Sequence, residues 1–175
     1  MAILTYTDFT GLHLITLQNA NDQALLTQII TYTEKHYLCK LLGDDLYVAF
    51  IAGIAEVTPA AKWTQLRDGV DYVYEDKTYV FQGVKEMLKY LVEASYNDRK
   101  LFIRGSIGNS IPLQELGAMS SEGFSDNQIG LLNFAIDIWN EAVYFIDRKN
   151  ADTPDTYENF EGVTLLHKVP GLDLL

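Results

Sequence analysis

The chain is poor in cysteine and in positive charge: it has one cysteine, and 13 basic residues against 24 acidic ones in 175 residues. A single cysteine cannot form a disulfide within the chain, and this usage is typical of a reducing compartment. The net charge of −11 repels phosphate, and no basic stripe is found, so we expect no specific binding of nucleic acid. An acidic wall past which DNA slides without sticking is compatible with the same charge.

Long apolar runs are missing as well. No run approaches the roughly 20 residues that a bilayer requires, so we expect no membrane-spanning helix. The first residues, MAILTYTDFTGLHLIT, contain no basic residue, which is atypical of a signal peptide. We therefore expect a soluble protein without a targeting segment, and the length corresponds to one domain with one core.

What the chain does contain is helical periodicity. Apolar residues recur every three to four positions, which predicts a mainly α fold, a bundle of about four helices. Asn21 and Asp22 are good N-caps for the first helix, Gly43 ends it, and Ser125 with Gln128 forms a capping box for the last one. The expected helices cover residues 21–42, 44–54, 84–103 and 126–148, with a short one from Pro59 to Leu66.

A small β-hairpin interrupts the helices. After the turn at residues 67–69 the apolar period changes to two, which predicts a hairpin over about residues 70–82. Such a hairpin is marginal by itself and must pack on something else. Residues 104–124 hold four glycines and four serines and are interpreted as a long loop, the kind of segment that often makes functional contacts.

Both ends of the chain lack helical period. Residues 1–20 are interpreted as an extended N-terminal arm that packs against another surface, and residues 21–150 as the helical domain. Residues 151–175 combine prolines and glycines with leucine, valine and phenylalanine, which favours a C-terminal docking arm over a solubilising linker.

Candidate catalytic or metal-binding residues have simpler structural interpretations. Asp44 and Asp45 are adjacent, so on one helix they point about 100° apart, and a helix cap after Gly43 explains them. His36 and Cys39 are spaced i, i+3, but a zinc site needs four ligands. No nucleophile elbow or phosphate-binding loop occurs. We expect no catalytic residue, no cofactor and no metal.

Tyrosine is over-represented, with eleven in the chain and four at positions 72, 74, 79 and 90, in and just after the hairpin. Tyrosine is enriched in interface cores because it combines a large rigid ring with a polar tip. The hairpin therefore packs either on its own bundle or between subunits, and the sequence leaves both interpretations open. The last helix has two adjacent apolar stripes, so it is either central in the bundle or faces a neighbouring subunit.

Three stretches resemble one known family. They are LLGDDLYVAF at residues 41–50, WTQLRDGVDYVYEDKTYVFQGVKEMLKYLVEASY at 63–96 and NFAIDIWNEAVYFIDRKN at 133–150. In their order and motifs they resemble the small helical head-to-tail connector, or adaptor, proteins of tailed phages, in the version found in phages of gut Bacteroidetes, crAss-like phages among them. The resemblance covers roughly residues 25–150. Val84 stands where the family pattern has a leucine, and both arms fall outside the resemblance.

The resemblance implies a structural virion protein of the phage neck, localised between capsid portal and tail after synthesis in the host cytoplasm. It implies a homo-oligomeric ring, commonly of about twelve copies, that joins the portal protein to other neck or tail ring proteins and lines the DNA channel. Alternatives are another neck piece, such as a stopper or tail-completion protein, or a small cytosolic helical enzyme or metal-binding protein that uses His36, Cys39 and Asp44.

Two sets of contact residues are predicted. The expected subunit-interface residues lie in the hairpin and the last helix: Tyr72, Tyr74, Tyr79, Phe81 and Trp139. The expected partner-docking residues lie in the C-terminal arm: Tyr157, Phe160, Val163, Leu165, Leu166 and Leu172.

Overall fold

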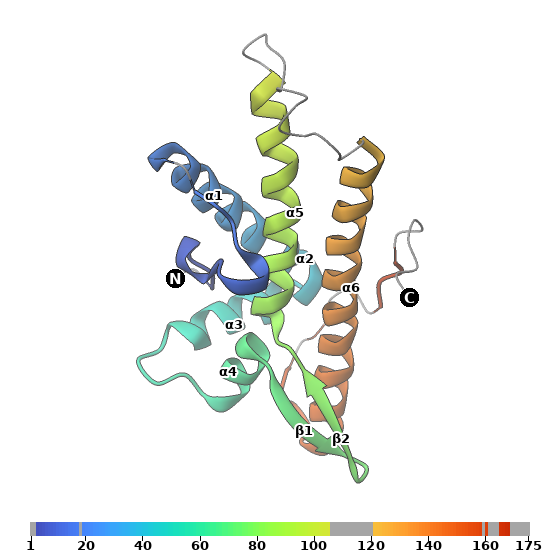
Figure 1. Ribbon diagram of the computed structural model, residues 1–175. Coiled ribbons are helices and arrows are strands. Elements are labelled where there is room, and N and C mark those ends of the chain that lie inside the picture. Colours follow the sequence, from blue (N-terminus) through green and yellow to red (C-terminus); the bar gives the residue numbers. More distant parts are fainter. Residues whose placement is uncertain (1–2, 18, 106–120, 159, 161–164, 169–175) are drawn as a thin grey trace.

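The computed structural model describes residues 3–17, 19–105, 121–158, 160 and 165–168, and it confirms a mainly helical fold with one two-stranded antiparallel hairpin (Figure 1). Its elements are two 3₁₀ turns, Tyr6–Asp8 and Gly11–His13, then α1 Ala20–Thr33, a π-helical turn Glu34–Leu38, α2 Cys39–Leu42, α3 Asp44–Ala55, α4 Ala61–Asp68, β1 Val70–Tyr74, β2 Lys77–Phe81, α5 Val84–Gly105 and α6 Ser121–Asp152.

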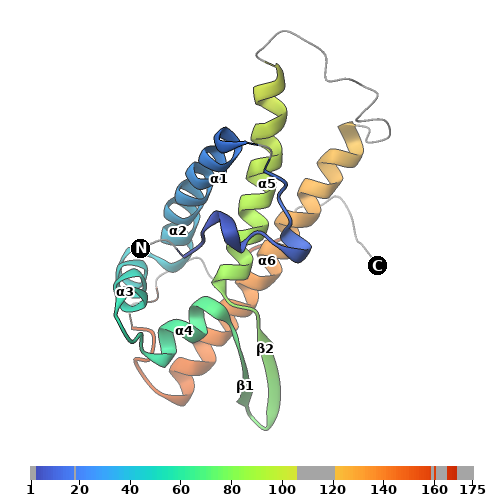
Figure 2. The same cartoon turned by 60° about the vertical axis from the view of Figure 1, so that its left-hand side comes forward.

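Helix α5 is the centre of the arrangement. It packs along α6, and it also contacts α1 and α4. Figure 1 shows α1 and α3 on the side of α5 opposite to α6, whereas α4 lies near the C-terminal end of α6, where the ring of Tyr157 is close to both Trp63 and Phe145. The hairpin extends from the ends of α4 and α5 beside the C-terminal half of α6 (Figure 2).

The first predicted helix is continuous from Ala20 to Leu42, with a π-helical turn in its middle. Its N-cap is Asn19 rather than Asn21 or Asp22, because the extended backbone of Asn19 lets its Oδ1 accept the backbone N–H groups of Asn21 and Asp22 at 2.9 and 3.0 Å. Gly43, with φ at +80°, ends the helix as expected.

The expectation that an aspartate caps α3 is wrong. Gly43 itself is the N-cap residue, and Asp44 and Asp45 occupy the first turn without a side-chain capping bond. Both carboxylates still lie at the positive end of the helix dipole, where negative charge is favourable. The Oδ1 atom of Asp44 instead accepts a bond from Cys39 Sγ at 3.0 Å.

The hairpin prediction is confirmed. Val70 pairs with Phe81 and Tyr74 with Lys77, and the strands alternate between an inner and an outer face. Gly69 and Gly83 flank the strands with φ of +88° and +87°, and their backbones approach so closely that a Cβ on either would overlap the other segment. Two glycines therefore close the base of the hairpin.

Helix α6 begins at Ser121, five residues before the predicted start, so Ser125 lies inside it and not at its cap. Residues 106–120 of the predicted loop lie outside the described residues. An 18-residue window within Asn127–Asp152 has a mean hydropathy of 1.2, so this helix is long and apolar enough to cross a membrane by length and composition only, a test that core helices of soluble proteins also pass. The helix is also a core helix, because Trp139, Ala142, Phe145 and Ile146 are fully buried by the chain itself.

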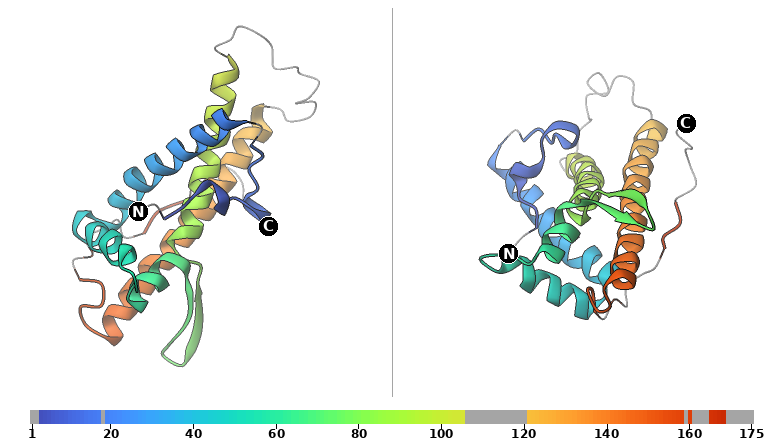
Figure 3. Two further views of the ribbon diagram at one scale, coloured as in Figure 1. Left: turned by 90° about the vertical axis from the view of Figure 1, so that its left-hand side faces the viewer. Right: turned by 90° about the horizontal axis from the view of Figure 1, so that it is seen from below.

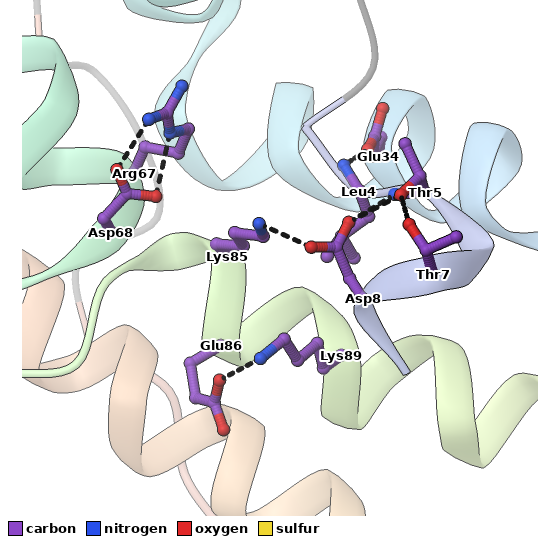
Figure 4. A network of polar contacts seen from close by, with 10 residues as sticks. All are labelled: Leu4, Thr5, Thr7, Asp8, Glu34, Arg67, Asp68, Lys85, Glu86 and Lys89. Carbon is purple, nitrogen blue, oxygen red and sulfur yellow. Dashed lines mark hydrogen bonds and ion pairs between the residues drawn. The ribbon is translucent and has the colours of Figure 1, made fainter. Parts of the chain in front are cut away.

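The N-terminal arm packs on its own chain. Ile3, Leu4 and Phe9 are buried in the main core. Its polar anchors are shown in part in Figure 4: Leu4 N donates to Glu34 Oε1 at 2.7 Å, and Asp8 Oδ1 pairs with Lys85 Nζ at 2.7 Å. The surface on which the sequence expected this arm to pack is thus supplied by α1, the π-helical turn and α5 of the same chain.

His13 fastens the second turn of the arm to α5. The imidazole is buried between two carboxylates, with Nε2 2.7 Å from Glu86 Oε1 and Nδ1 3.1 Å from Glu93 Oε2. The ring of Tyr90 meets the imidazole edge-on at 4.4 Å. Partial burial by itself would raise the pKa of Glu86, but the contacts with Lys89 and His13 together lower this pKa below its ordinary value. The arm is therefore attached by apolar burial, by the Asp8–Lys85 ion pair and by the two polar contacts of His13.

Two helical glycines differ in what a methyl group would meet, which makes them a matched pair. A Cβ on Gly53 of α3 would overlap the indole of Trp63, whereas a Cβ on Gly130 of α6 meets nothing within 4 Å. We expect Gly53→Ala to lower the free energy of unfolding by about 2 kcal/mol through overpacking. Gly130→Ala is expected to raise it by about 0.5 to 1 kcal/mol through helix propensity. Urea denaturation checks both, and equal effects would contradict the packing of α3 on α4.

Glu34 is expected to make stability depend on pH. Burial raises the pKa of this carboxyl, although the N–H of Leu4 partly offsets the effect. The folded chain therefore holds the proton more tightly than the unfolded chain, so this contribution is complete below the ordinary carboxyl pKa and is lost as pH rises through the raised one.

Glu34→Gln is expected to flatten that part of the pH profile, because the amide oxygen still accepts from Leu4 without a charge to desolvate. Urea midpoints between about pH 4 and about pH 8 measure it. The exposed Glu56→Gln serves as control. Identical slopes in wild type and Glu34→Gln would show that Glu34 does not govern this dependence.

Candidate functional site

The residues weighed for chemistry are engaged in ordinary contacts. His36 stacks on Tyr32 with ring centres 5.0 Å apart, and its Nε2 lies 3.3 Å from Lys40 Nζ. The bond to Asp44 raises the pKa of the Cys39 thiol, which disfavours the nucleophilic thiolate. Among the described residues, no three side chains of histidine, cysteine, aspartate or glutamate are grouped as a metal site.

The inner face of the hairpin packs on α6 of the same chain. Tyr72, Phe81 and Trp139 are only 7%, 2% and 0% exposed, so these three predicted interface residues have almost no surface to offer a second subunit. Phe81 stacks on Phe145 at 4.7 Å, and Tyr72 meets the same ring edge-on at 5.1 Å. Of the two interpretations that the sequence left open, packing on its own bundle holds for this face.

Arg148 of α6 holds the remaining hairpin tyrosines. Its guanidinium carbon lies 3.7 Å from the ring centre of Tyr79 and 5.5 Å from that of Tyr74, and Nη1 donates to the Tyr72 hydroxyl at 2.9 Å. Tyr74 and Tyr79 are half-buried. Cation–π contacts of this kind are worth about 0.5 to 2 kcal/mol, depending on how far they are shielded from water. The cluster fixes the hairpin on the last turns of α6.

The outer face of the hairpin, by contrast, is open. Val73 and Val80 point away from α6 and are 62% and 63% exposed. On α6, Phe134 and Tyr144 are also half-exposed, at 50% and 48%. We call these four residues the hairpin–α6 face. They are the exposed apolar side chains of two elements that pack on each other through Tyr72, Phe81 and Phe145.

A groove of about 410 Å³ adjoins this face, and Gln82, Tyr90 and Glu141 line it together with Phe134 and Tyr144. Burial raises the pKa of Glu141, one oxygen of which accepts the backbone N–H of Gln82. Its Oε2 is buried without a hydrogen-bond partner among the described residues. The groove is therefore a recess in the hairpin–α6 face with one unsatisfied polar atom in its wall.

A second set of exposed apolar side chains belongs to the helices nearer the N-terminus. Tyr32, Tyr37, Val48 and Val57 of α1, the π-helical turn, α3 and the segment after it are all exposed, and we call them the α1–α3 face. It includes a shallow hollow of about 530 Å³, lined by Thr27, Gln28, Thr31, Tyr32, Lys35 and His36. The lining is mainly aliphatic and aromatic carbon, despite the polar residue types.

The described part of the C-terminal arm returns along α6. Tyr157 is 1% exposed, its ring centre lies 6.0 Å from that of Trp63, and its hydroxyl donates to the carbonyl of Lys62 at 2.8 Å. Burial raises the pKa of this phenol well above its usual range. Phe160 lies against Trp139, with ring centres 6.3 Å apart, and Leu166 is half-buried.

The six predicted docking residues fall into three groups: packed on the chain, exposed, and outside the described residues. Tyr157, Phe160 and Leu166 pack on their own chain, and Leu165 is 45% exposed. Val163 and Leu172 lie outside the described residues. Figure 3 shows the segment near residue 165 beside α6. A docking role for the arm on a portal or an adjacent ring stays a prediction, and Leu165 is the member of the set with described surface to offer.

The sequence reasoning did not single out Arg148, Asn140 or Asn150. One signal was available for Arg148, since it follows Tyr144 by four positions and so shares a helical face with it. The asparagines carried no local signal, because their partners lie 26 and 7 residues further along in a segment without periodicity.

No family model, curated protein or solved structure matches this chain. Function is therefore inferred from the surfaces described above.

Proposed function

We propose that this chain is a structural, non-enzymatic component of a phage neck, in which copies assemble into a ring between the portal and the tail. The observation that supports it is the presence of two different sets of exposed apolar side chains, the hairpin–α6 face and the α1–α3 face, which belong to different helices and strands. A ring with head-to-tail contacts needs two unlike surfaces, because each copy presents one to the left and the other to the right.

The shapes of the two faces are compatible with such a contact. The hairpin projects beside the end of α6 (Figure 1) and carries Val73 and Val80 on its outer side. The α1–α3 face offers a hollow bounded by Tyr32 and His36. Tyrosine at the receiving side supplies large, rigid contact area, as in many interface cores. The proposed contact therefore seats the hairpin–α6 face of one copy on the α1–α3 face of the next.

Charge supports the place of the ring around DNA. With 24 acidic residues against 13 basic ones, the chain repels a passing duplex overall, which suits a conduit better than a DNA-binding protein. The proposed partners are further copies of the chain, the portal protein and other neck or tail ring proteins. A stopper or tail-completion protein is the related assignment within the same class.

The head-to-tail contact is tested by mixing two variants, Val80→Glu on the hairpin and Val48→Glu on α3. Both side chains are more than 60% exposed, so neither change is expected to unfold the chain. Each variant alone is expected to stay monomeric in size-exclusion chromatography with light scattering, because a charge is placed in an apolar contact. An equimolar mixture is expected to form one-to-one pairs and nothing larger, through the one face of each that remains intact.

The wild-type chain, alone or with its portal protein, is the reference and is expected to form the ring. Thr16→Glu, at an exposed site on neither face, is the charge control and is expected to assemble like the wild type. A wild type that stays monomeric in both settings, or a mixture that fails to pair, would overturn the head-to-tail proposal. A portal gene beside the gene for this chain would support the neck assignment independently.

A further inference from the structure

The groove beside the hairpin–α6 face carries negative charge that its own chain leaves partly unpaired. Two of the residues that line it are acidic, Asp137 and Glu141, and none of them is basic. Asp137 and Glu141 are one helical turn apart on α6, a spacing at which like charges repel. Lys168 compensates Asp137 through an ion pair of 2.8 Å. Glu141 belongs to no ion pair among the described residues.

Glu141 has one carboxylate oxygen without a donor. The carboxylate accepts the backbone N–H of Gln82, but its Oε2 atom is buried and has no hydrogen-bond partner among the described residues. Burial raises the pKa of Glu141, and the charge of Asp137 raises it further. A cation at Oε2 would offset both causes, because it stabilises the charged carboxylate directly. The group that suits this groove is therefore a positively charged donor.

The rest of the lining fits the stem of a long basic side chain. Tyr90, Phe134 and Tyr144 supply aromatic carbon, and the rings of Tyr90 and Phe134 stack with their centres 5.4 Å apart. The volume of about 410 Å³ lies at the lower end of the range of pockets that bind small molecules, so one side chain can enter. Lysine covers apolar surface with its methylene stem and places its ammonium at polar groups.

Lys35 is a basic residue of the hollow on the α1–α3 face, and it is exposed. The lining of this hollow contains Lys35 and His36 and no acidic residue. The preceding residue, Glu34, is turned inward, where it accepts the N–H of Leu4. No ion pair between the described residues includes Lys35. It lies in the π-helical turn Glu34–Leu38, and such turns within α-helices are frequent at functional sites.

We propose that the groove of one copy binds Lys35 of the next copy, with the ammonium group donating to Glu141 Oε2. This rests on the proposed head-to-tail contact, in which the same two faces meet. Each chain has a net charge of −11, so two copies repel one another overall. A contact between them therefore requires local pairing of opposite charges, and the acidic groove and the basic hollow supply it. In a closed ring every copy gives one Lys35 and receives another.

A double-mutant cycle across the two one-sided variants tests this ion pair. When the Val80→Glu and Val48→Glu chains are mixed, the α1–α3 face of the first can meet only the hairpin–α6 face of the second. Lys35→Gln is therefore added to the Val80→Glu chain and Glu141→Gln to the Val48→Glu chain, separately and together. Glu141→Gln removes the charge but keeps an oxygen for the N–H of Gln82. Isothermal titration calorimetry in low and in high salt measures the Kd of each pair.

Each single substitution is expected to raise Kd about tenfold in low salt, and the two together by no more than either alone, because both remove the same ion pair. High salt is expected to reduce the effect. Lys40→Gln, at an exposed lysine outside the lining of the hollow, is the matched control and should leave Kd unchanged. Exchanging the two substitutions between the chains moves both away from the contact. The effect should then disappear, which also shows that the variants fold.

The failure of this inference and the failure of the head-to-tail contact give different results. Pairs whose Kd is unchanged by Lys35→Gln and by Glu141→Gln overturn the ion pair and leave the head-to-tail contact standing. Losses that add up in the double variant, or a loss with Glu141→Gln alone, indicate another donor in the groove and overturn the assignment of Lys35. One-sided variants that do not pair at all overturn both.

Discussion

The C-terminal half of α6 must be covered on several sides at once, and the rest of the chain is arranged to do so. Trp139, Ala142, Phe145 and Ile146 are at 0% exposure, and they do not share one narrow helical stripe. One neighbouring helix covers only one side of another, and α5 is that neighbour here. The inner face of the hairpin covers a second side, where Tyr72 meets Phe145. Tyr157 and Phe160 of the C-terminal arm cover a third side, against Phe145 and Trp139. Hairpin and arm are thus parts of one core, and neither is an appendage.

This constraint determines which surfaces remain for partners. Since the inner hairpin face is packed on α6, the exposed apolar residues of the hairpin are the outward Val73 and Val80.

Locally encoded features were predictable from the sequence, and long-range ones were not. The hairpin and the break at Gly43 follow from a change of period and from a glycine, and both are confirmed. Ser125 failed as a helix start because a capping sequence inside a helix looks the same as one at its end, and only the packing of the whole segment decides between them.

The candidate surfaces show the same division. Apolar content predicted that both arms pack, but composition does not name the receiving surface. Tyr157 of the C-terminal arm packs in the chain's own core, and so does Trp139 of α6. The residues that surround them are far apart in the sequence. The outward valines of the hairpin follow from strand alternation once the inner face is known, and so they were within reach of the sequence.

Polar contacts give both arms a defined register. An apolar segment on an apolar helix loses little by sliding one turn, because hydrophobic contact is not directional. The N-terminal arm is held against sliding by His13, whose two nitrogens face carboxylates seven residues apart on α5. The C-terminal arm is held by Asn140 and Asn150, which bind backbone groups nine residues apart. Because a misplaced arm would leave these polar groups unpaired, each arm has one favoured register on the helix that receives it.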